Sequence, residues 1–348
     1  MAGPIDAAAL HRDAVVADTH NDLLMLVTRR PRARQAAYFR ERWLPQLRAG
    51  GVNVQVLPVF IDDAFRPEGA LRQTLRMIEA THHVIEANAD DVQLCLDGAD
   101  IDDALAAGRI AAVLALEGCE AVGYDVGLLE TLFRLGIRLA SFTHFGRTAL
   151  ADGSAEDGTG SRLTSAGVEA LALMEQLGML IDVSHLSASG TDHVLELATR
   201  PVVASHSSAF AVQAHHRNLT DERLKGIART GGVVGVNFFY GFIDPLQPTL
   251  DRLVDHIEHI ASVAGIDHVG LGPDFIREVC EEFPPPPGEA LLDGFDDTIV
   301  IPGLDGPAGL PLVTAILVGR GWPEADIRKV VGENWLRVFR AELGVPAS

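Results

Sequence analysis

The sequence predicts a (β/α)8 barrel, and three observations lead to this fold class. Short apolar segments rich in β-branched residues alternate with longer segments of helical periodicity along almost the whole chain. Eight such apolar segments are present, which is the number of strands that closes a parallel barrel of this kind. Each segment is nearly continuous in apolar residues, as strands are when helices cover both faces of their sheet. A doubly wound open sheet is the alternative, but no glycine-rich phosphate loop follows the first segment.

The expected elements follow one another from the first residues to the last. Eight strands are predicted at 14–20, 52–60, 110–118, 138–144, 179–185, 201–206, 232–239 and 268–275. Between them, segments such as 167–178 and 249–265 repeat apolar residues every three or four positions, the pattern of an amphipathic helix. The proline- and acid-rich segment 281–297 cannot continue a helix, and we expect it to cross the mouth of the barrel. Because no linker interrupts the alternation, residues 1–348 are predicted to form a single domain.

Composition and charge limit the classes of partner. The chain has 348 residues, of which 47% are hydrophobic, so it can bury a large core. Its 48 acidic and 28 basic residues give a net charge of −20, which repels nucleic acids and anionic membrane surfaces. Neither nucleic acid nor membrane is therefore expected as a partner. An anionic substrate would need a cation placed inside its pocket.

The cysteines and the first residues predict the compartment. Cys95, Cys119 and Cys280 are widely spaced and form no CxxC pair, so neither a disulfide framework nor a cysteine zinc site is indicated. The first residues lack the basic start and apolar core of a signal peptide, and no apolar run is long enough to cross a membrane. We therefore expect a soluble, cytoplasmic protein.

Residues that can bind metals or transfer protons stand at the ends of six of the eight apolar segments. In a parallel barrel all strands point the same way, and their carboxyl ends meet at one rim, where the site of such barrels lies. Residues that are distant in sequence would become neighbours there. The residues at the segment ends are His20, Asp22, Glu117, His144, His185, His206 and Asp274.

The residue types in this set predict a pair of metal ions. His20 and Asp22 are separated by one residue, so on a strand they would face the same side about 6.6 Å apart and could chelate one ion. His185 and His206 offer a second set, and Glu117 could bridge both ions through its two carboxylate oxygens. Zinc suits such ligands, although manganese or iron would bind similar ones. The two ions would share a water molecule or hydroxide.

Each of these residues also has a simpler interpretation. A single histidine in a chain with 13 is usually an ordinary hydrogen-bonded group. Glu117 could supply the negative charge that is favoured at a helix N-terminus. The segment SHSS at 205–208 could suggest a serine nucleophile, but without a GxSxG elbow Ser205 and Ser207 are expected to orient His206 or to cap the next helix. The conjunction of five candidate ligands at strand ends favours the metal site.

Longer motifs resemble the membrane (renal) dipeptidase family, metallopeptidases that use an amidohydrolase-type barrel. The resemblance extends over almost the entire chain. Its motifs, in order, are DTHNDL (18–23), LEG (116–118), LGIRLASFTH (135–144), LGMLIDVSH (177–185), PVVASHSSA (201–209), HHRNLTDE (215–222), GGVVGVNFF (231–239), GLGPDF (270–275) and DIRKVVGENWLRVF (326–339). The resemblance implies a metal-dependent amidohydrolase-like barrel with two Zn²⁺ per chain, a dipeptidase that hydrolyses short peptides, and a homodimer.

The family pattern also implies a role for each matching residue. One zinc ion would be held by His20, Asp22 and Glu117, and the other by Glu117, His185 and His206. A hydroxide bridging the two ions would attack the peptide bond. His144 would polarise the scissile carbonyl, and Arg217 would hold the substrate carboxylate. Asp274 would move the proton. Arg217 would be the local cation that a strongly acidic chain needs for an anionic substrate.

Departures from the family pattern concern the substrate. Arg147 stands where the family commonly has asparagine, and Ile276 and Arg277 replace the usual Asp-Gly that follows Asp274 and Phe275. Two new cations near an acidic rim could favour substrates with an acidic side chain. The resemblance is also compatible with a D-configured C-terminal residue in the substrate.

Two other functions would use much of the same site. A different binuclear amidohydrolase, acting on N-acyl amino acids or lactones, would share the metal ions and Asp274. A zinc-binding relative without catalysis would lose its ligands as the sequence drifts, whereas all candidate ligands are present here. Dipeptide hydrolysis is therefore the predicted activity.

Overall fold

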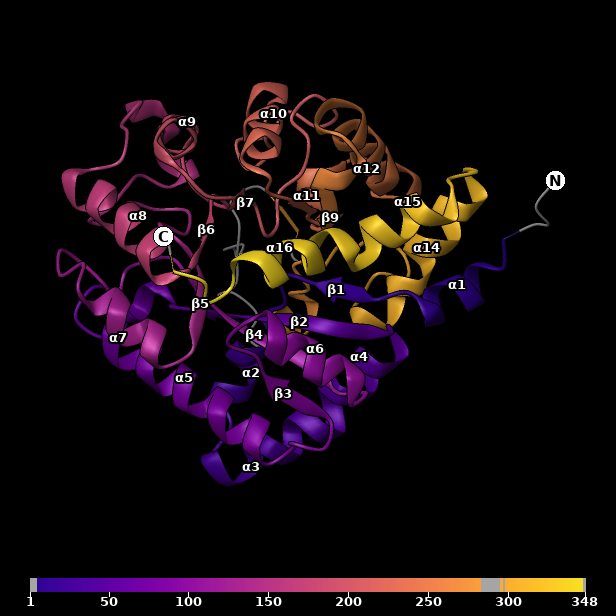
Figure 1. Ribbon diagram of the computed structural model, residues 1–348, viewed down its shortest axis with the longest axis horizontal. Coiled ribbons are helices and arrows are strands. Elements are labelled where there is room, and N and C mark those ends of the chain that lie inside the picture. Colours follow the sequence, from indigo (N-terminus) through magenta and orange to yellow (C-terminus); the bar gives the residue numbers. More distant parts are fainter. Residues whose placement is uncertain (1–4, 283–294, 297, 347–348) are drawn as a thin grey trace.

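The eight expected strands are all present, and they form a parallel barrel at the centre of the molecule (Figure 1). The computed structural model describes residues 5–282, 295–296 and 298–346. In the order β1-β2-β4-β5-β6-β7 the strands form one continuous sheet, and β8 pairs with β9. The barrel strands are β1 (Val16–Asp18), β2 (Val52–Phe60), β4 (Ile110–Glu117), β5 (Ile137–Ser141), β6 (Leu180–Asp182), β7 (Val202–Val203), β8 (Val234–Val236) and β9 (Val269–Leu271).

Two isolated bridges join the sheet to the β8–β9 pair. Ala204, just beyond β7, pairs in parallel with Val234 of β8. Asn21, beyond β1, pairs in parallel with Phe275, beyond β9. The sheet therefore curls until its first and last strands meet. The prediction of an α/β barrel of the amidohydrolase type is confirmed, and the open doubly wound sheet is wrong.

Helices surround the barrel and were expected from the amphipathic segments. The segments 167–178 and 249–265 correspond to α8 and α12, whose first turns are capped by the side chains of Thr164 and Thr249. In chain order the α-helices of the described residues are α1 (Ala7–Asp13), α2 (Leu23–Thr28), α3 (Arg32–Tyr38), α4 (Leu44–Ala49), α5 (Ala70–Glu86), α6 (Gly98–Ala106), α7 (Leu128–Arg134), α8 (Ser165–Leu177), α9 (Ala188–Leu197), α10 (Asp221–Thr230), α11 (Tyr240–Ile243), α12 (Leu250–Ala264), α13 (Arg277–Glu282), α14 (Leu310–Gly319), α15 (Glu324–Arg328) and α16 (Asn334–Glu342).

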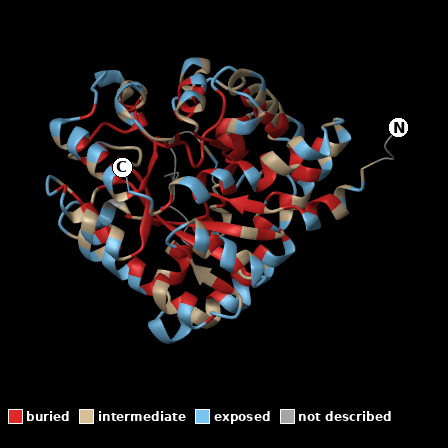
Figure 2. Ribbon diagram, in the orientation of Figure 1, coloured by how far each residue is buried: buried red, intermediate tan, exposed pale blue. Residues whose placement is uncertain are grey.

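The side chains of β4 alternate between the inside and the outside of the barrel. Val113 and Ala115 belong to the buried cluster inside the barrel, whereas Leu114 and Leu116 belong to the cluster between the strands and the helices. All residues of β4 are buried, in keeping with the central strands in Figure 2. Glu117, the last residue of β4, is in phase with the inner positions. Its carboxylate is therefore carried at the carboxyl end of the barrel interior.

Helix α16 closes the opposite end of the barrel. Trp335 and Phe339 of this helix belong to the same buried cluster as the inner residues of the strands. Trp335 packs so tightly against β9 that a Cβ on Gly270 would lie 2.3 Å from its Nε1 atom, so a side chain at this position would displace the indole. With this end filled, the barrel interior is reached from the rim formed by the carboxyl ends of the strands.

The strand prediction was wrong in two details. The short strand β3 (Val92–Leu94), which pairs with the beginning of β4, was missed because only its first residue is fully buried and no apolar run marks it. Strand β1 ends at Asp18, so His20 and Asp22 do not share a strand face. Instead, the Asp18 carboxylate accepts a hydrogen bond from the backbone N–H of His20 (3.1 Å) and turns the chain out of the sheet.

The segment expected to cross the barrel mouth, 281–297, lies mostly outside the described residues. Among the helices that the structure describes, none combines the length and the apolar character needed to cross a membrane.

Candidate metal centre and active site

The structure brings the predicted site residues together at one rim of the barrel. Each lies at or just beyond the carboxyl end of a strand, because the chain leaves the sheet at these polar residues. Asp22 is the residue before α2 and sits beside His20 and Asp274. The others are His20 after β1, Glu117 at the end of β4, His144 after β5, His185 after β6, His206 after β7 and Asp274 after β9.

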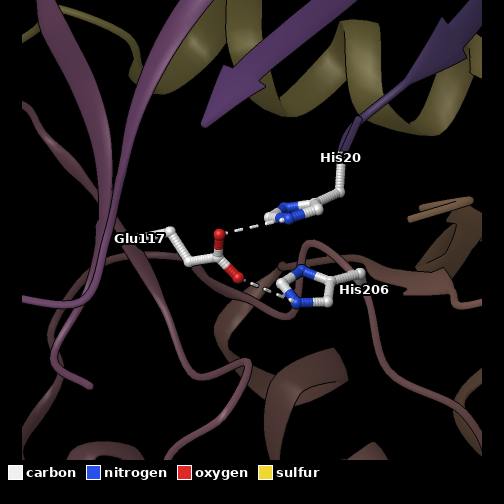
Figure 3. Close-up of side chains that lie close together, drawn as sticks. All are labelled: His20, Glu117 and His206. Atoms are coloured by element: carbon white, nitrogen blue, oxygen red, sulfur yellow. Dashed lines mark ion pairs between the residues drawn. The ribbon is translucent and has the colours of Figure 1, made fainter. Parts of the chain in front are cut away.

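The Glu117 carboxylate lies close to several histidines of this group, and Figure 3 shows its two oxygens directed toward His20 and His206. Its Oε2 atom is 3.4 Å from Nε2 of His20, and its Oε1 atom is 3.1 Å from Nε2 of His185. Oε1 is also 3.6 Å from Nε2 of His206. The two oxygens therefore face different histidines, which is the arrangement that a bridging carboxylate requires. Glu117 ends a strand and does not stand at a helix N-terminus, so the simpler interpretation of this residue is wrong.

The chemistry of the group fits metal cations. The carboxylates of Asp22, Glu117 and Asp274 share one small space, and like charges so close together need compensation. Burial, and then the charge of Glu117, raises the pKa of Asp22 well above its usual value. Among the described residues, Nε2 of His20 has no hydrogen-bond partner. The candidate ligand atoms of His20, Asp22 and Asp274 lie within 4.8 Å of one another, and so do those of His20, Glu117 and His206.

The protonation states of the histidines agree with this assignment. Burial lowers the pKa of His185 and of His206, so both imidazoles are neutral, which is the form that binds metal ions. Burial also lowers the pKa of His20, but the carboxylates of Glu117, Asp274 and Asp22 together outweigh it and raise this pKa to about 10. Without a metal ion, a proton on His20 thus balances part of the carboxylate charge, and a cation would take its place.

A buried chain of hydrogen bonds, the Asp182–Ser205 relay, contacts His206 on the side of the ring that faces away from Glu117. The Ser205 hydroxyl donates to Oδ2 of Asp182 (2.5 Å) and lies 2.7 Å from Nδ1 of His206. The Nδ1–H tautomer of His206 satisfies this chain and leaves Nε2 as a lone pair directed at Glu117. Ser205 lies between the acid and the imidazole, whereas a nucleophilic serine would have the imidazole in the middle. The contact between Ser205 and His206 agrees with the expectation that Ser205 orients this histidine, whereas the Ser207 hydroxyl has no partner among the described residues. Asp182 belongs to the same hydrogen-bond chain and was missed by sequence reasoning.

Asp274 has a distinctive backbone. Its φ of 60° lies in the left-handed region, and its N–H donates to the carbonyl oxygen of His20 (2.9 Å). The side-chain amide of Asn237 donates to Oδ2 of Asp274 (2.7 Å), while Oδ1 lies 3.8 Å from Nε2 of His20. Asn237 was also missed, although a polar residue ending the apolar run of β8 is the same signal that identified the other site residues.

A cavity of about 550 Å³ opens beside the group, and its lining includes Glu117, His144, His185 and Asp274. Its size is that of a pocket for a small molecule. His144 reaches Glu117 with an Nε2–Oε1 distance of 3.9 Å, and its ring packs against Phe60 at 4.6 Å between centroids. Burial, followed by the charges of two nearby arginines, lowers the pKa of His144, so a neutral imidazole faces the cavity.

Arg217 is a buried cation close to this cavity. Only 3% of the residue is exposed, and one of its terminal nitrogens donates to the carbonyl oxygen of His206 (3.2 Å). Its Nε has no partner among the described residues. The guanidinium carbon lies 5.6 Å and 5.5 Å from the ring centroids of Phe145 and Phe242, two residues of the cavity wall. Burial lowers its pKa to about 10, which still leaves the group charged at neutral pH.

Arg147 and Arg277, the two cations that depart from the family pattern, do not line the cavity. Arg147 forms a two-pronged ion pair with Asp152, and Arg277 pairs with Glu281 and Asp305. Of the departures noted in the sequence, Ile276 is the one that lines the cavity. The structure therefore gives no support to the hypothesis that these arginines select an acidic side chain.

Comparisons with known sequences agree with the motifs. The model of the membrane dipeptidase family (peptidase family M19) matches residues 5–284. Dipeptidase verJ of Clonostachys rogersoniana is 32% identical over 271 residues, which are 78% of this chain. The chain spans 65% of the length of that relative.

Comparisons with solved structures agree with the fold. The dipeptidase AC, a family M19 metallopeptidase, is 27% identical with a TM-score of 0.83, covering 95% of this chain and 99% of its own. A metallopeptidase from Rhodobacter sphaeroides, liganded with a phosphinate mimic of the dipeptide L-Ala-D-Ala, is 26% identical with the same TM-score of 0.83. The alignment with it covers 95% of this chain and 100% of that one.

Proposed function

Because the chain belongs to the membrane dipeptidase family M19, we propose that it is a binuclear zinc dipeptidase that hydrolyses the peptide bond of short peptides. The observation that carries this proposal is the position of the Glu117 carboxylate, whose two oxygens lie against histidines from three different strand ends. Asp274 and His144 lie beside it on the wall of a cavity large enough for a dipeptide.

The residues that would hold the two metal ions form two sets. His20, Asp22 and Glu117 form the first, and Glu117, His185 and His206 form the second. When bound, the ions would supply Lewis acidity and lower the pKa of a coordinated water molecule. The Asp182–Ser205 relay would keep His206 in the tautomer that binds a cation.

Asp274 would move the proton during hydrolysis. A new C–O bond forms between the attacking water oxygen and the peptide carbonyl carbon, and the C–N bond then breaks. Asp274 would take the proton that the water loses and deliver it to the leaving amine nitrogen, a transfer worth about 10²- to 10⁴-fold in rate. Asn237 would fix the Asp274 carboxylate for this task through its 2.7 Å hydrogen bond.

His144 and Arg217 would bind the substrate. The neutral imidazole of His144 would donate a hydrogen bond to the carbonyl oxygen as negative charge develops on it. Arg217, which is buried near Phe145 and Phe242 of the cavity wall, would hold the C-terminal carboxylate. An anchor for a free carboxylate close to the reacting bond favours dipeptides over longer chains. The mimic of L-Ala-D-Ala bound by the Rhodobacter sphaeroides relative supports acceptance of a D-configured C-terminal residue.

The test combines metal content with hydrolysis of L-Xaa-L-Xaa and L-Xaa-D-Xaa dipeptides. We expect two equivalents of zinc per chain, and turnover that is lost in Asp274→Asn while the zinc remains bound. Two equivalents of zinc without turnover of any dipeptide would reject the proposal and direct the search to N-acyl amino acids and lactones. Fewer than two equivalents after loading with excess zinc would reject the binuclear centre.

A further inference from the structure

The wall of the cavity is unusually rich in phenylalanine. Five of its 19 lining residues are phenylalanines, namely Phe60, Phe145, Phe239, Phe242 and Phe295. The whole chain of 348 residues contains only 14. More than a third of the phenylalanines of an aromatic-poor protein are thus gathered around one cavity, which calls for an explanation beyond the filling of the core.

The five phenylalanines divide into two groups. Phe60 and Phe145 pack against the imidazole of His144, with ring centroids 4.6 Å and 4.7 Å away. Their packing against this candidate site residue accounts for their presence. Phe239, Phe242 and Phe295 contact one another instead. The ring centroids of Phe239 and Phe242 are 4.8 Å apart, and the Phe295 centroid lies 5.6 Å from that of Phe239 and 6.3 Å from that of Phe242.

Contacts among the described residues hold the second group in place. Phe295 packs over Gly241, where an added Cβ would lie 2.4 Å from its ring. The neighbouring Asp296 N–H donates to the Tyr240 hydroxyl (2.5 Å), which fixes the position of this segment. The ring of His215 extends the group, 4.7 Å from Phe242 and 5.7 Å from Phe295. Burial, followed by the charges of His216 and Arg217, lowers the pKa of His215 to about 4, so the ring is neutral.

The group lies next to the proposed anchor for the substrate carboxylate. The Arg217 guanidinium is 5.5 Å from the ring centroid of Phe242, so a C-terminal carboxylate bound there would place the side chain of the same residue beside the aromatic rings. We infer that Phe239, Phe242, Phe295 and His215 form an aromatic subsite that selects dipeptides with a large apolar C-terminal residue. This inference rests on the proposed dipeptidase function and names its class of substrate.

Charge argues in the same direction. Arg66, the arginine on the cavity wall, pairs with Glu120 at 3.2 Å and donates to the carbonyl oxygen of Ile61, so its charge is compensated within the protein. The carboxylate of Asp62 on the same wall is paired with Arg29 at 3.5 Å, and those of Asp22, Glu117 and Asp274 belong to the candidate metal centre. The described lining residues beside the aromatic group therefore offer no uncompensated arginine to an acidic substrate side chain, whereas an apolar side chain would exchange water for aromatic surface.

The experiment compares kcat/KM of the zinc-loaded protein for L-Ala-Ala, L-Ala-Phe and L-Ala-Asp, each with an L- and a D-configured C-terminal residue. We expect the Phe substrate to exceed the Ala substrate by about tenfold or more in the accepted configuration, and the Asp substrate to be the poorest. Phe295→Ala should reduce the Phe-to-Ala ratio by about tenfold. Phe242→Leu, which keeps most of the buried volume, is a second variant and should reduce the same ratio.

The matched control is Phe210→Ala, because Phe210 is 42% exposed and does not line the cavity. This control should leave the ratio unchanged. Turnover of all three dipeptides with no preference, or with a preference for Asp, would overturn the subsite and leave the dipeptidase function standing. An unchanged Phe-to-Ala ratio of kcat/KM in both Phe295→Ala and Phe242→Leu would also overturn the subsite and leave the dipeptidase function standing. No turnover of any dipeptide would overturn the proposed function and this inference with it.

Discussion

Replacing Ser205 by alanine should weaken zinc binding by about 10- to 100-fold. In the wild type, the Ser205 hydroxyl lies 2.7 Å from Nδ1 of His206 and 2.5 Å from Oδ2 of Asp182, and His206 is fully buried. In the variant without metal, the imidazole proton can move to Nε2, which lies 2.8 Å from Nε2 of His185. Binding a cation at Nε2 would force that proton back to Nδ1, where it would have no acceptor.

The size of the expected loss in zinc affinity follows from the cost of leaving the Nδ1 proton of His206 without an acceptor. An unsatisfied buried donor costs about 1–3 kcal/mol, and each 1.4 kcal/mol is a factor of ten in an equilibrium constant. The cost arises only in the metal-bound state, so it enters the zinc affinity in full. The assay is competition for zinc with a chromophoric chelator, accompanied by the melting temperature of the metal-free protein.

Ser207→Ala is the matched control, because Ser207 flanks the same histidine, is 2% exposed, and has no partner for its hydroxyl among the described residues. Its zinc affinity should equal that of the wild type. An equal loss in both variants would mean that the relay does not orient His206. Unchanged affinity in Ser205→Ala would refute the reasoning outright.

Three further predictions concern single residues. Arg217→Lys should raise KM for a dipeptide by about tenfold or more, because a lysine cannot form the two-pronged contact with a carboxylate; steady-state kinetics at full zinc loading test this, and an unchanged KM would contradict it. Asp274→Asn should lose turnover but keep the melting temperature, since asparagine tolerates the φ of 60° and can accept the Asn237 hydrogen bond, whereas Asp274→Ala should also melt earlier. His256 is fully buried, accepts from Ala209 N–H and lies 3.0 Å from the carbonyl oxygen of Ile243, and burial lowers its pKa to about 4. Its neutral form therefore stabilises the fold fully above pH 6.5, and roughly 3 kcal/mol of unfolding free energy should be lost between pH 6.5 and 4. Denaturant titrations between pH 6.5 and 4 should show a smaller loss of unfolding free energy in His256→Gln than in the wild type. An equal loss in both proteins would contradict the assignment of this pH dependence to His256.

The fold and the positions of the candidate ligands were largely predictable because both depend on local patterns. Buried parallel strands are continuous apolar runs, and the point where each run meets a polar residue marks the rim of the barrel. Within β4 the alternation of inner and outer side chains alone places Glu117 on the inside. The exception was His20 and Asp22, whose strand geometry was wrong because the Asp18 carboxylate turns the chain out of the sheet.

The substrate side of the site was not predictable because it depends on contacts between distant segments. Arg147 and Arg277 looked like cations available to a substrate, yet Asp152 and Asp305 pair with them. The aromatic subsite that we infer combines residues from three segments that are distant in sequence, namely His215, Phe239 with Phe242 at helix α11, and Phe295, and no local pattern distinguishes its phenylalanines from those of the core.

The backbone explains how strand ends can present ligands toward a common centre. His185 and Asp274 are the two residues other than glycine that have a positive φ in the described part of the chain, at 67° and 60°. Each lies three residues beyond the end of a strand, His185 after β6 and Asp274 after β9, where a continued extended backbone would turn alternate side chains away from the barrel axis. The left-handed conformation redirects the side chain at a cost of about 1–2 kcal/mol, which a glycine would avoid. Residues other than glycine that are held in such conformations cluster at functional sites. The strain at these two positions therefore supports, independently of the distances, that both side chains serve the site.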